Sequence, residues 1–255
     1  MKILASDYDG TLKYKEHITA EDIEAIKKWK AEGNLFVIDT GRSMESILEE
    51  AGKYNLPVDF YITNNGGMVF DKEGNVLFSS CLPVDVSHQI MTLASQMKGV
   101  VSYVVNDGWY RHRIVIDSGL KEYRYPDLMP DLDEKQVFEM NKYAQIVLSF
   151  DSVRKASEAS QYLNEQYGCQ ICAYANKYVT DIVPKGISKA RGLLFLSNLL
   201  SVEENNIYSI GDGENDIPLM EFAGHGGCMA SAKSQLRCHA CYLCESVSDY
   251  IKKIS

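Results

Sequence analysis

Residues 2–11 read KILASDYDGT and change character in the middle, from apolar to polar. The first part, residues 2–6, is a short apolar run of the kind that forms a buried strand. Asp7 and Asp9 follow it directly, two residues apart. The stretch therefore predicts a buried strand that ends in a turn carrying two carboxylates.

Two further apolar runs have the same organisation. Residues 35–38 and 60–62 are strand-like, and polar, glycine-containing turns follow them at residues 39–42 and 63–67. Between the runs, apolar residues recur at helical spacing, as in the helix that we expect to begin after Thr19. Strands that alternate with helices are typical of βαβ units and a parallel sheet, whose ligands bind at the carboxyl ends of the strands. The polar turns therefore mark one expected binding site.

The middle of the chain breaks this alternation. Residues 82–183 combine expected helices with several strand-like runs, which indicates a separate α+β unit. The helices are expected at residues 84–97 and 152–167, and the strand-like runs lie at residues 100–105, 113–116, 144–149, 171–174 and 178–183. The earlier alternation then resumes with a helix at residues 187–200 and a strand at residues 206–210. We therefore predict an α/β fold in which residues 1–81 and 184–255 form a discontinuous parallel-sheet core and residues 82–183 form one inserted domain.

The composition is that of a soluble globular protein, because 45% of the residues are hydrophobic and 24% are charged. A formal net charge of −9 without a basic cluster argues against binding to nucleic acid or to an anionic membrane. No apolar run approaches the ~18 residues that span a bilayer, and the apolar start is too short for a signal peptide. The seven scattered cysteines indicate reduced thiols. We expect a cytoplasmic protein without nucleic-acid or membrane partners.

A second pair of carboxylates follows the expected strand at residues 206–210. Asp212 and Asp216 lie in the glycine-rich stretch GDGEND. Together with Asp7 and Asp9 they would repel one another unless a cation held them. A site made only of oxygen ligands favours a hard cation, and we expect magnesium.

Three other residues supply what the carboxylates lack. Thr40 offers a hydroxyl group, Gly41 a backbone amide that a ligand can approach, and Lys189 a compact positive charge. Carboxylates, magnesium, a hydroxyl and a lysine around glycine-rich turns are the parts that phosphoryl transfer needs.

Four stretches of the chain, in order, resemble the motifs of the haloacid dehalogenase (HAD) superfamily, and within it the Cof-like sugar-phosphatase branch. Residues 7–11, DYDGT, are similar to motif one (DxDGT), and residues 40–42, TGR, are similar to motif two. Lys189 matches motif three, and residues 211–216, GDGEND, are similar to motif four (GDGxND). The resemblance covers essentially the whole chain and implies a Rossmann-like core with an inserted α/β cap domain.

The resemblance also implies the roles of the carboxylates. Asp7 would be the nucleophile that forms an aspartyl-phosphate, and Asp9 would be the general acid and base. Magnesium would be held by Asp7, Asp9 and Asp212, with Asp9 contributing its backbone carbonyl. Asp216 would be a further metal ligand through water or would orient the other ligands.

The phosphoryl group would be bound by four residues of motifs two to four, by the same resemblance. Thr40, Gly41 and Lys189 would hold the phosphoryl oxygens and offset charge in the transition state. Asn215 would donate a hydrogen bond near the phosphate.

We therefore expect a magnesium-dependent phosphatase that hydrolyses a small phosphorylated metabolite, either a sugar phosphate or a phosphorylated cofactor, through an aspartyl-phosphate. Two alternatives stay open: a phosphomutase of the same superfamily, and a non-catalytic sensor of magnesium and a phosphorylated ligand. The intact Asp7 and Asp9 argue against the sensor, since a pure binder needs neither a nucleophile nor an acid. The expected partner is a small molecule, and the chain is expected to be a monomer or a small homo-oligomer.

Two residues near the motifs have two interpretations each, and one motif residue has a rival. Asn65 either lines the site or only forms a turn before Gly66. Arg42 either reaches the inserted domain or caps its own helix. Lys185 is a rival to Lys189, but only Lys189 has the motif spacing.

Two compositional features have a functional and a structural interpretation. Cys238, Cys241 and Cys244 follow a CxxCxxC spacing that would suit zinc or an iron–sulfur cluster. A strand there would point Cys241 and Cys244 to opposite faces, so an ordinary strand and loop is the preferred interpretation. Nine of the sixteen tyrosines lie in residues 82–183, where they either stack on a sugar or, as we favour, simply suit strands.

Overall fold

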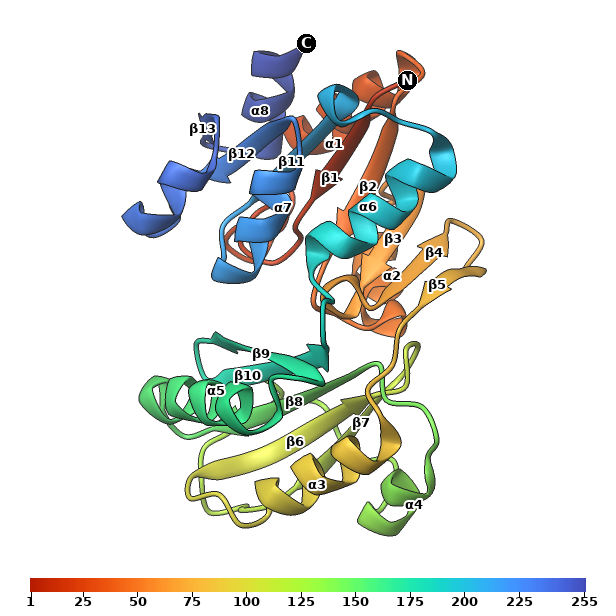
Figure 1. Cartoon of the computed structure of the whole chain (residues 1–255). Helices are drawn as coiled ribbons and strands as arrows, with labels where there is room; N and C mark the ends of the chain where they lie inside the picture. The colour runs from red at the N-terminus through yellow and green to blue at the C-terminus, as the bar shows by residue number, and fades with distance from the viewer. The chain divides into compact units, whose positions relative to one another are not determined.

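The computed structural model describes all 255 residues, and the chain divides into two compact units, each with its own sheet (Figure 1). The first unit comprises Met1–Arg42, Ser46–Phe78 and Ser188–Ser255, and the second comprises Ser43–Glu45 and Ser79–Ile187. The divisions at Phe78 and Ile187 lie within a few residues of the boundaries predicted from the sequence. The short piece Ser43–Glu45, which groups with the second unit, was not part of that prediction.

The first unit contains an eight-stranded sheet in the order β13-β12-β11-β1-β2-β3-β4-β5. Its strands are β1 (Ile3–Ser6), β2 (Leu35–Asp39), β3 (Phe60–Thr63), β4 (Met68–Asp71), β5 (Val76–Ser79), β11 (Ile207–Gly211), β12 (His225–Met229) and β13 (Tyr242–Cys244). The strands from β13 to β3 pair in parallel, and β4 is antiparallel to β3. The turns after β1 and β2 and the end of β11 carry motifs one, two and four, and the turn Asn64–Gly66 follows β3.

Helices accompany this sheet as the alternation of the sequence predicts. They are α1 (Ala20–Ala31), α2 (Met44–Lys53), α6 (Lys189–Leu200), α7 (Ile217–Phe222) and α8 (Val247–Ile254), with short 3₁₀ turns at Asn64–Gly66, Glu204–Asn206, Glu214–Asp216 and Ser234–His239. The side chain of Thr19 caps α1 by accepting from the Asp22 backbone N–H at 3.1 Å. No helix of the chain is both long enough and apolar enough to cross a membrane.

Both faces of the first sheet are covered by helices. On one face, Ile3 and Ala5 of β1 pack in a buried cluster with Leu193 of α6 and Leu219 of α7. On the other face, Trp29 of α1 meets the ring of Tyr208 edge-on at 5.5 Å between centroids. Burial on both faces explains why these strands appear in the sequence as continuous apolar runs.

The second unit has a five-stranded antiparallel sheet in the order β7-β6-β8-β10-β9. Its strands are β6 (Val100–Asn106), β7 (Arg111–Val115), β8 (Gln145–Phe150), β9 (Ile171–Asn176) and β10 (Val179–Pro184), and its helices are α3 (Val84–Ala94), α4 (Glu134–Glu139) and α5 (Val153–Tyr167). Tyr103, Leu148, Ile90 of α3 and Leu163 of α5 belong to one buried cluster. The predicted α/β fold with a parallel-sheet core and an inserted α+β unit is confirmed.

Three elements were not predicted from the sequence. The strands β4 and β5 follow β3 without an intervening α-helix, so they lie outside the strand–helix alternation, and the residues of β5 are exposed or half-buried. The helix α4 has six residues, too few to show a clear helical period. The helix expected at residues 84–97 ends instead at Ala94, before the turn that contains Gly99 with φ +87°.

Candidate active site

The predicted site residues gather at the carboxyl ends of neighbouring strands. Asp7 follows β1, Thr40 follows β2, and Asp212 follows β11, and these strands are adjacent in the order β11-β1-β2. The Asp7 backbone N–H donates to the Ile210 carbonyl at 2.9 Å, which fixes the turn after β1 to the end of β11. Residues that are about 200 positions apart therefore share one edge of the sheet.

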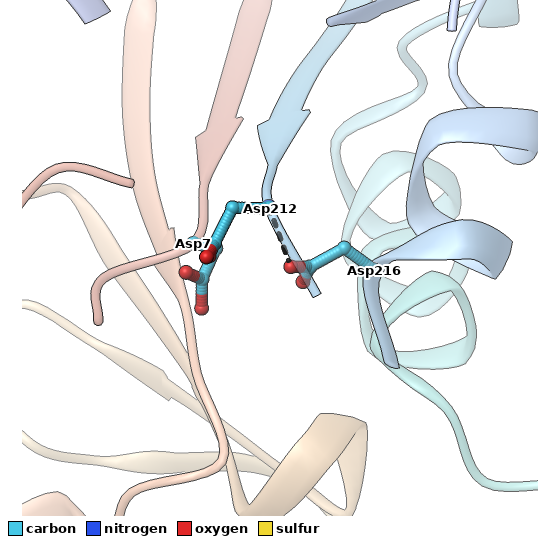
Figure 2. A group of neighbouring side chains, drawn as sticks. All are labelled: Asp7, Asp212 and Asp216. Atoms are coloured by element: carbon cyan, nitrogen blue, oxygen red, sulfur yellow. Dashed lines mark hydrogen bonds between the residues drawn. The ribbon is translucent and has the colours of Figure 1, made fainter. Parts of the chain in front are cut away.

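Three carboxylates form a group at this edge (Figure 2). Asp7, Asp212 and Asp216 each offer an oxygen, and these ligand atoms all lie within 4.8 Å of one another. Burial is the largest influence on Asp7 and raises its pKa well above the usual range, opposed by Lys189 and reinforced by Asp216 and Asp212. Burial and the charge of Asp216 also raise the pKa of Asp212. Ionised carboxylates at this spacing need a cation.

The donor set fits magnesium. All three groups offer oxygen, and Oδ2 of Asp7 is buried without any hydrogen-bond partner in the chain. Gly10 leaves room for the group, since a Cβ atom there would lie 2.4 Å from Oδ2 of Asp212. The side chain of Asp9 is not part of the group, and the predicted use of its backbone carbonyl stays a prediction.

Lys189 is the cation that the chain itself brings to these carboxylates. It is the first residue of α6, it is 1% exposed, and its Nζ donates to Oδ1 of Asp7 and to Oδ1 of Asp216, at 2.6 Å each. Burial alone would lower the pKa of Lys189, but the charges of Asp216, Asp7 and Asp39 raise it overall. Lys189 is therefore charged, whereas its rival Lys185 is exposed.

Asp216 organises the turn after β11. Its Oδ2 accepts from the backbone N–H groups of Asp212 at 3.0 Å and Gly213 at 2.9 Å, and the first of these bonds is drawn in Figure 2. Thr11 adds a hydroxyl bond of 3.1 Å to Oδ1 of Asp212. These bonds and the one from Lys189 connect Asp216 to the turn after β11 and to α6, and its role as metal ligand or as orienting residue stays a prediction.

Asp9 forms an ion pair with Arg42. The guanidinium Nε and Nη2 atoms each lie 2.6 Å from one oxygen of Asp9, and Nη1 donates to the hydroxyl of Ser46 at 3.0 Å. Neither sequence interpretation of Arg42 included this pair. The sequence could have indicated this pair, because the opposite charges of Asp9 and Arg42 lie in the turns after two strands that are expected to be neighbours.

The turn that carries Asp9 is braced from α2. Oε2 of Glu50 accepts from the hydroxyl of Tyr8 at 3.3 Å and from Nζ of Lys13 at 2.6 Å. Burial would raise the pKa of Glu50, but the hydrogen bonds from Lys13 and Lys53 outweigh it and lower the pKa to about 2. This bracing was not predicted from the sequence, because helical spacing alone gives Glu50 an ordinary exposed position.

The turns after β2 and β3 are joined through their backbones. Thr40 N–H donates to the Ile62 carbonyl at 2.8 Å, and the Asn65 N–H donates to the Thr40 carbonyl at 3.1 Å. Asn65 is 2% exposed, and its Oδ1 accepts from Nδ2 of Asn215 at 3.0 Å. Asn65 therefore forms a turn and also lies beside Asn215, which is predicted to bind phosphate.

Comparison with known proteins agrees with this geometry. A family model described as haloacid dehalogenase-like hydrolase matches residues 4–250. The chain belongs to the haloacid dehalogenase-like hydrolase family. The family resemblance and the hydrolase class predicted from the sequence are thereby confirmed.

Several known proteins are similar to this chain over nearly their whole length. A protein of Bacillus subtilis named 5-amino-6-(5-phospho-D-ribitylamino)uracil phosphatase YwtE is 26% identical over 270 residues, covering 93% of this chain and 90% of its own. An HMP-PP phosphatase of Yersinia pseudotuberculosis is 25% identical over 244 residues, covering 92% and 86%. The solved structure of a HAD-superfamily phosphatase from Bacteroides thetaiotaomicron has a TM-score of 0.84 at 25% identity, covering 100% of this chain and 94% of that one.

One buried carboxyl group of this family member lies outside the predicted set. Asp39, the last residue of β2, is 0% exposed, and neither of its oxygens has a hydrogen-bond partner. Burial raises its pKa well above the usual range, although Lys189 acts in the opposite direction. The available signal was a single carboxylate in the otherwise apolar run LFVID.

The structure does not bring the three cysteines of the CxxCxxC stretch together as metal ligands. Cys244 is buried, whereas Cys238 and Cys241 are exposed. The group of potential ligands that the chain forms is the acidic one of Asp7, Asp212 and Asp216. In the inserted unit, Tyr103 and Tyr143 lie in the hydrophobic cluster, which agrees with the structural interpretation of those tyrosines.

Proposed function

We propose that this family member is a magnesium-dependent phosphatase that hydrolyses a small phosphorylated metabolite through an aspartyl-phosphate on Asp7. One observation carries the proposal: Oδ1 of Asp7 is held by the buried Lys189, while Oδ2 is left without a partner beside Asp212 and Asp216. A carboxylate fixed through one oxygen keeps the other available for metal and substrate.

The reaction has two displacements at phosphorus. Asp7 attacks the phosphorus atom, the bond from phosphorus to the leaving oxygen breaks, and Asp9 gives that oxygen a proton. Asp9 then takes a proton from water, which attacks the phosphorus and releases inorganic phosphate and free Asp7. Because Arg42 binds both oxygens of Asp9, at least one of these bonds must open when Asp9 takes up its proton.

The remaining predicted residues bind and neutralise the phosphoryl group. Asp7 and Asp212 would hold magnesium, which would supply positive charge against the phosphoryl oxygens and the carboxylates. Lys189, the hydroxyl of Thr40, the backbone amide of Gly41 and the side chain of Asn215 supply the other contacts. Most of these groups are fixed by hydrogen bonds to their neighbours before substrate arrives, which lowers the reorganisation needed in the transition state.

The proposed substrate class rests on the relatives. The two named relatives are phosphatases of small molecules. The substrate in the name of one relative is 5-amino-6-(5-phospho-D-ribitylamino)uracil, and that of the other is HMP-PP. We infer a sugar phosphate or a phosphorylated cofactor as the substrate here. The cytoplasmic location, the absence of nucleic-acid and membrane partners, and a monomer or small homo-oligomer stay predictions from the sequence.

The test is release of phosphate from p-nitrophenyl phosphate in the presence of Mg²⁺. We expect Asp7→Asn to abolish release while circular dichroism stays unchanged, and we expect a chelator to suppress the wild type reversibly. Asp127→Asn, which changes an exposed aspartate, is the matched control and should keep full activity. Undiminished release by Asp7→Asn would contradict the assignment of the nucleophile.

The same assay, repeated with sugar phosphates, separates the alternatives. Release of phosphate without an acceptor supports hydrolysis. Strict isomerisation of a sugar phosphate would instead identify a phosphomutase, and binding without turnover would identify a sensor.

A further inference from the structure

The turn after β3 has an unusual backbone. Asn64, Asn65 and Gly66 have φ values of +53°, +54° and +94°, all in the left-handed region. Gly66 is required by sterics, since a Cβ atom there would lie 1.9 Å from the carbonyl oxygen of Ser188. Asn65 is not required in this way, because glycine adopts its conformation at least as readily. The side chain of Asn65 therefore needs another explanation.

That side chain joins two parts of the site. Oδ1 of Asn65 accepts from Nδ2 of Asn215, which is 150 positions away in the sequence. The same amide group lies against Gly41, since a Cβ atom on Gly41 would be 3.1 Å from both Oδ1 and Nδ2 of Asn65. Asn65 thus contacts the turn after β2 and the turn after β11 at once.

The hydrogen bond from Nδ2 of Asn215 to Oδ1 of Asn65 fixes the orientation of the Asn215 amide. Oδ1 of Asn215 lies beside Gly213, 2.6 Å from where a Cβ atom of that glycine would be. Nδ2 of Asn215 donates one hydrogen to Asn65, and its second hydrogen makes no bond within the chain. A half-buried amide held in this way has one N–H left for a ligand.

We propose that Asn65 is a positioning residue, which orients the amide of Asn215 so that its second N–H donates to the phosphoryl group. The inference rests on the proposed function for the identity of that group. Asn65 acts through Asn215, because its Oδ1 accepts from Nδ2 of Asn215 and its own Nδ2 is buried away from the surface that a ligand reaches.

Because Nδ2 of Asn65 has no hydrogen-bond partner, the effect of Asn65 on activity can be measured separately from its effect on stability. Removing the side chain loses one hydrogen bond but also removes a buried N–H group without an acceptor, and these effects oppose each other. Asn65→Gly keeps the left-handed backbone accessible. We therefore expect this variant to unfold at nearly the same denaturant concentration as the wild type.

The experiment is a double-mutant cycle of Asn65→Gly and Asn215→Ala. Two readouts are measured in Mg²⁺: kcat/KM for p-nitrophenyl phosphate, and the dissociation constant of inorganic phosphate by calorimetry. We expect Asn65→Gly to lower kcat/KM by about 10- to 100-fold, the usual size of an effect on a supporting residue. The double variant should lose no more than Asn215→Ala alone, because Asn65 works through Asn215.

Asn55→Gly is the matched control, since Asn55 is exposed and also has a positive φ of 49°. It should leave both readouts unchanged. The inference would be overturned if the effects of the two site variants multiply. It would also be overturned if the Asn65→Gly protein is as active as the wild type and binds phosphate as tightly. If the wild type binds phosphate but hydrolyses nothing, the proposed function fails, and the binding cycle still decides whether Asn65 acts through Asn215.

Discussion

Asp39 shows at the scale of one residue how closely charge is gathered beside the site. Its carboxyl group is fully buried, has no hydrogen-bond partner, and lies near enough to Lys189, Asp216 and Asp7 for their charges to influence it. An ionised carboxylate in such a place lowers stability unless a cation compensates for it.

The pKa of Asp39 gives a prediction about pH. Burial raises this pKa in the folded chain above its unfolded value of about 3.9. The folded chain thus keeps the proton at pH values where the unfolded chain has lost it, so stability from this group is full below about pH 4 and falls as pH rises. We expect Asp39→Asn, measured by urea unfolding, to become more stable relative to the wild type between about pH 4 and pH 7. An offset independent of pH would contradict this account.

At this scale the sequence predicted the residues better than their contacts. Asp7, Asp212, Asp216 and Lys189 follow from their positions in the motifs, and the structure places all four together. The ion pair of Asp9 with Arg42 depends on side-chain direction in two separate turns. Such directions are set by packing between elements and leave no periodic signal in the chain.

At the scale of elements, the 3₁₀ turn Asn64–Gly66 positions the start of α6, and hence Lys189. Its Gly66 packs against the Ser188 carbonyl, directly before the first residue of α6. Any side chain at this position would have to displace backbone atoms.

Two glycines give a matched test of that contact. Gly33 and Gly66 both have positive φ, but a Cβ atom on Gly33 would meet nothing within 4 Å. Gly33→Ala should cost only the left-handed strain, about 1–2 kcal/mol. Gly66→Ala should cost a further ~1–3 kcal/mol for the displaced packing and should also lower kcat. Equal unfolding free energies of the two variants would show that α6 adapts without strain.

The same scale explains which elements were missed. The core helices are long enough to repeat their apolar positions, as in α1, where Ile26 and Trp29 are buried. The short core strands are recognisable because helices alternate with them. No α-helix separates β4 and β5 from β3, so the alternation does not indicate them, and α4 has only six residues. The α4 start was nonetheless marked by a capping box between Asp133 and Gln136.

At the scale of the whole molecule, the net charge of −9 has a different meaning once the site is known. Several acidic groups are concentrated in one buried cluster that fits a divalent cation. A divalent cation held there would, together with Lys189, reverse the sign of the local charge, so an acidic chain is compatible with an anionic substrate.

Binding of magnesium should therefore stabilise the whole fold. At 100 times its dissociation constant, a ligand of the native state adds about 2.7 kcal/mol to the free energy of unfolding. We expect Mg²⁺ to raise the thermal midpoint of the wild type and of Asp127→Asn, and to raise that of Asp212→Asn much less. Equal gains for all three proteins would place the ion elsewhere.

The most direct test of the account is to trap the phosphorylated enzyme. The wild type is mixed with substrate and Mg²⁺, quenched in acid within the first turnover, and reduced with borohydride, which converts an aspartyl-phosphate to homoserine. The account predicts homoserine at position 7 by mass spectrometry, and none when Mg²⁺ is chelated. Turnover with aspartate intact at position 7 at every quench time, or modification at another aspartate, would contradict it.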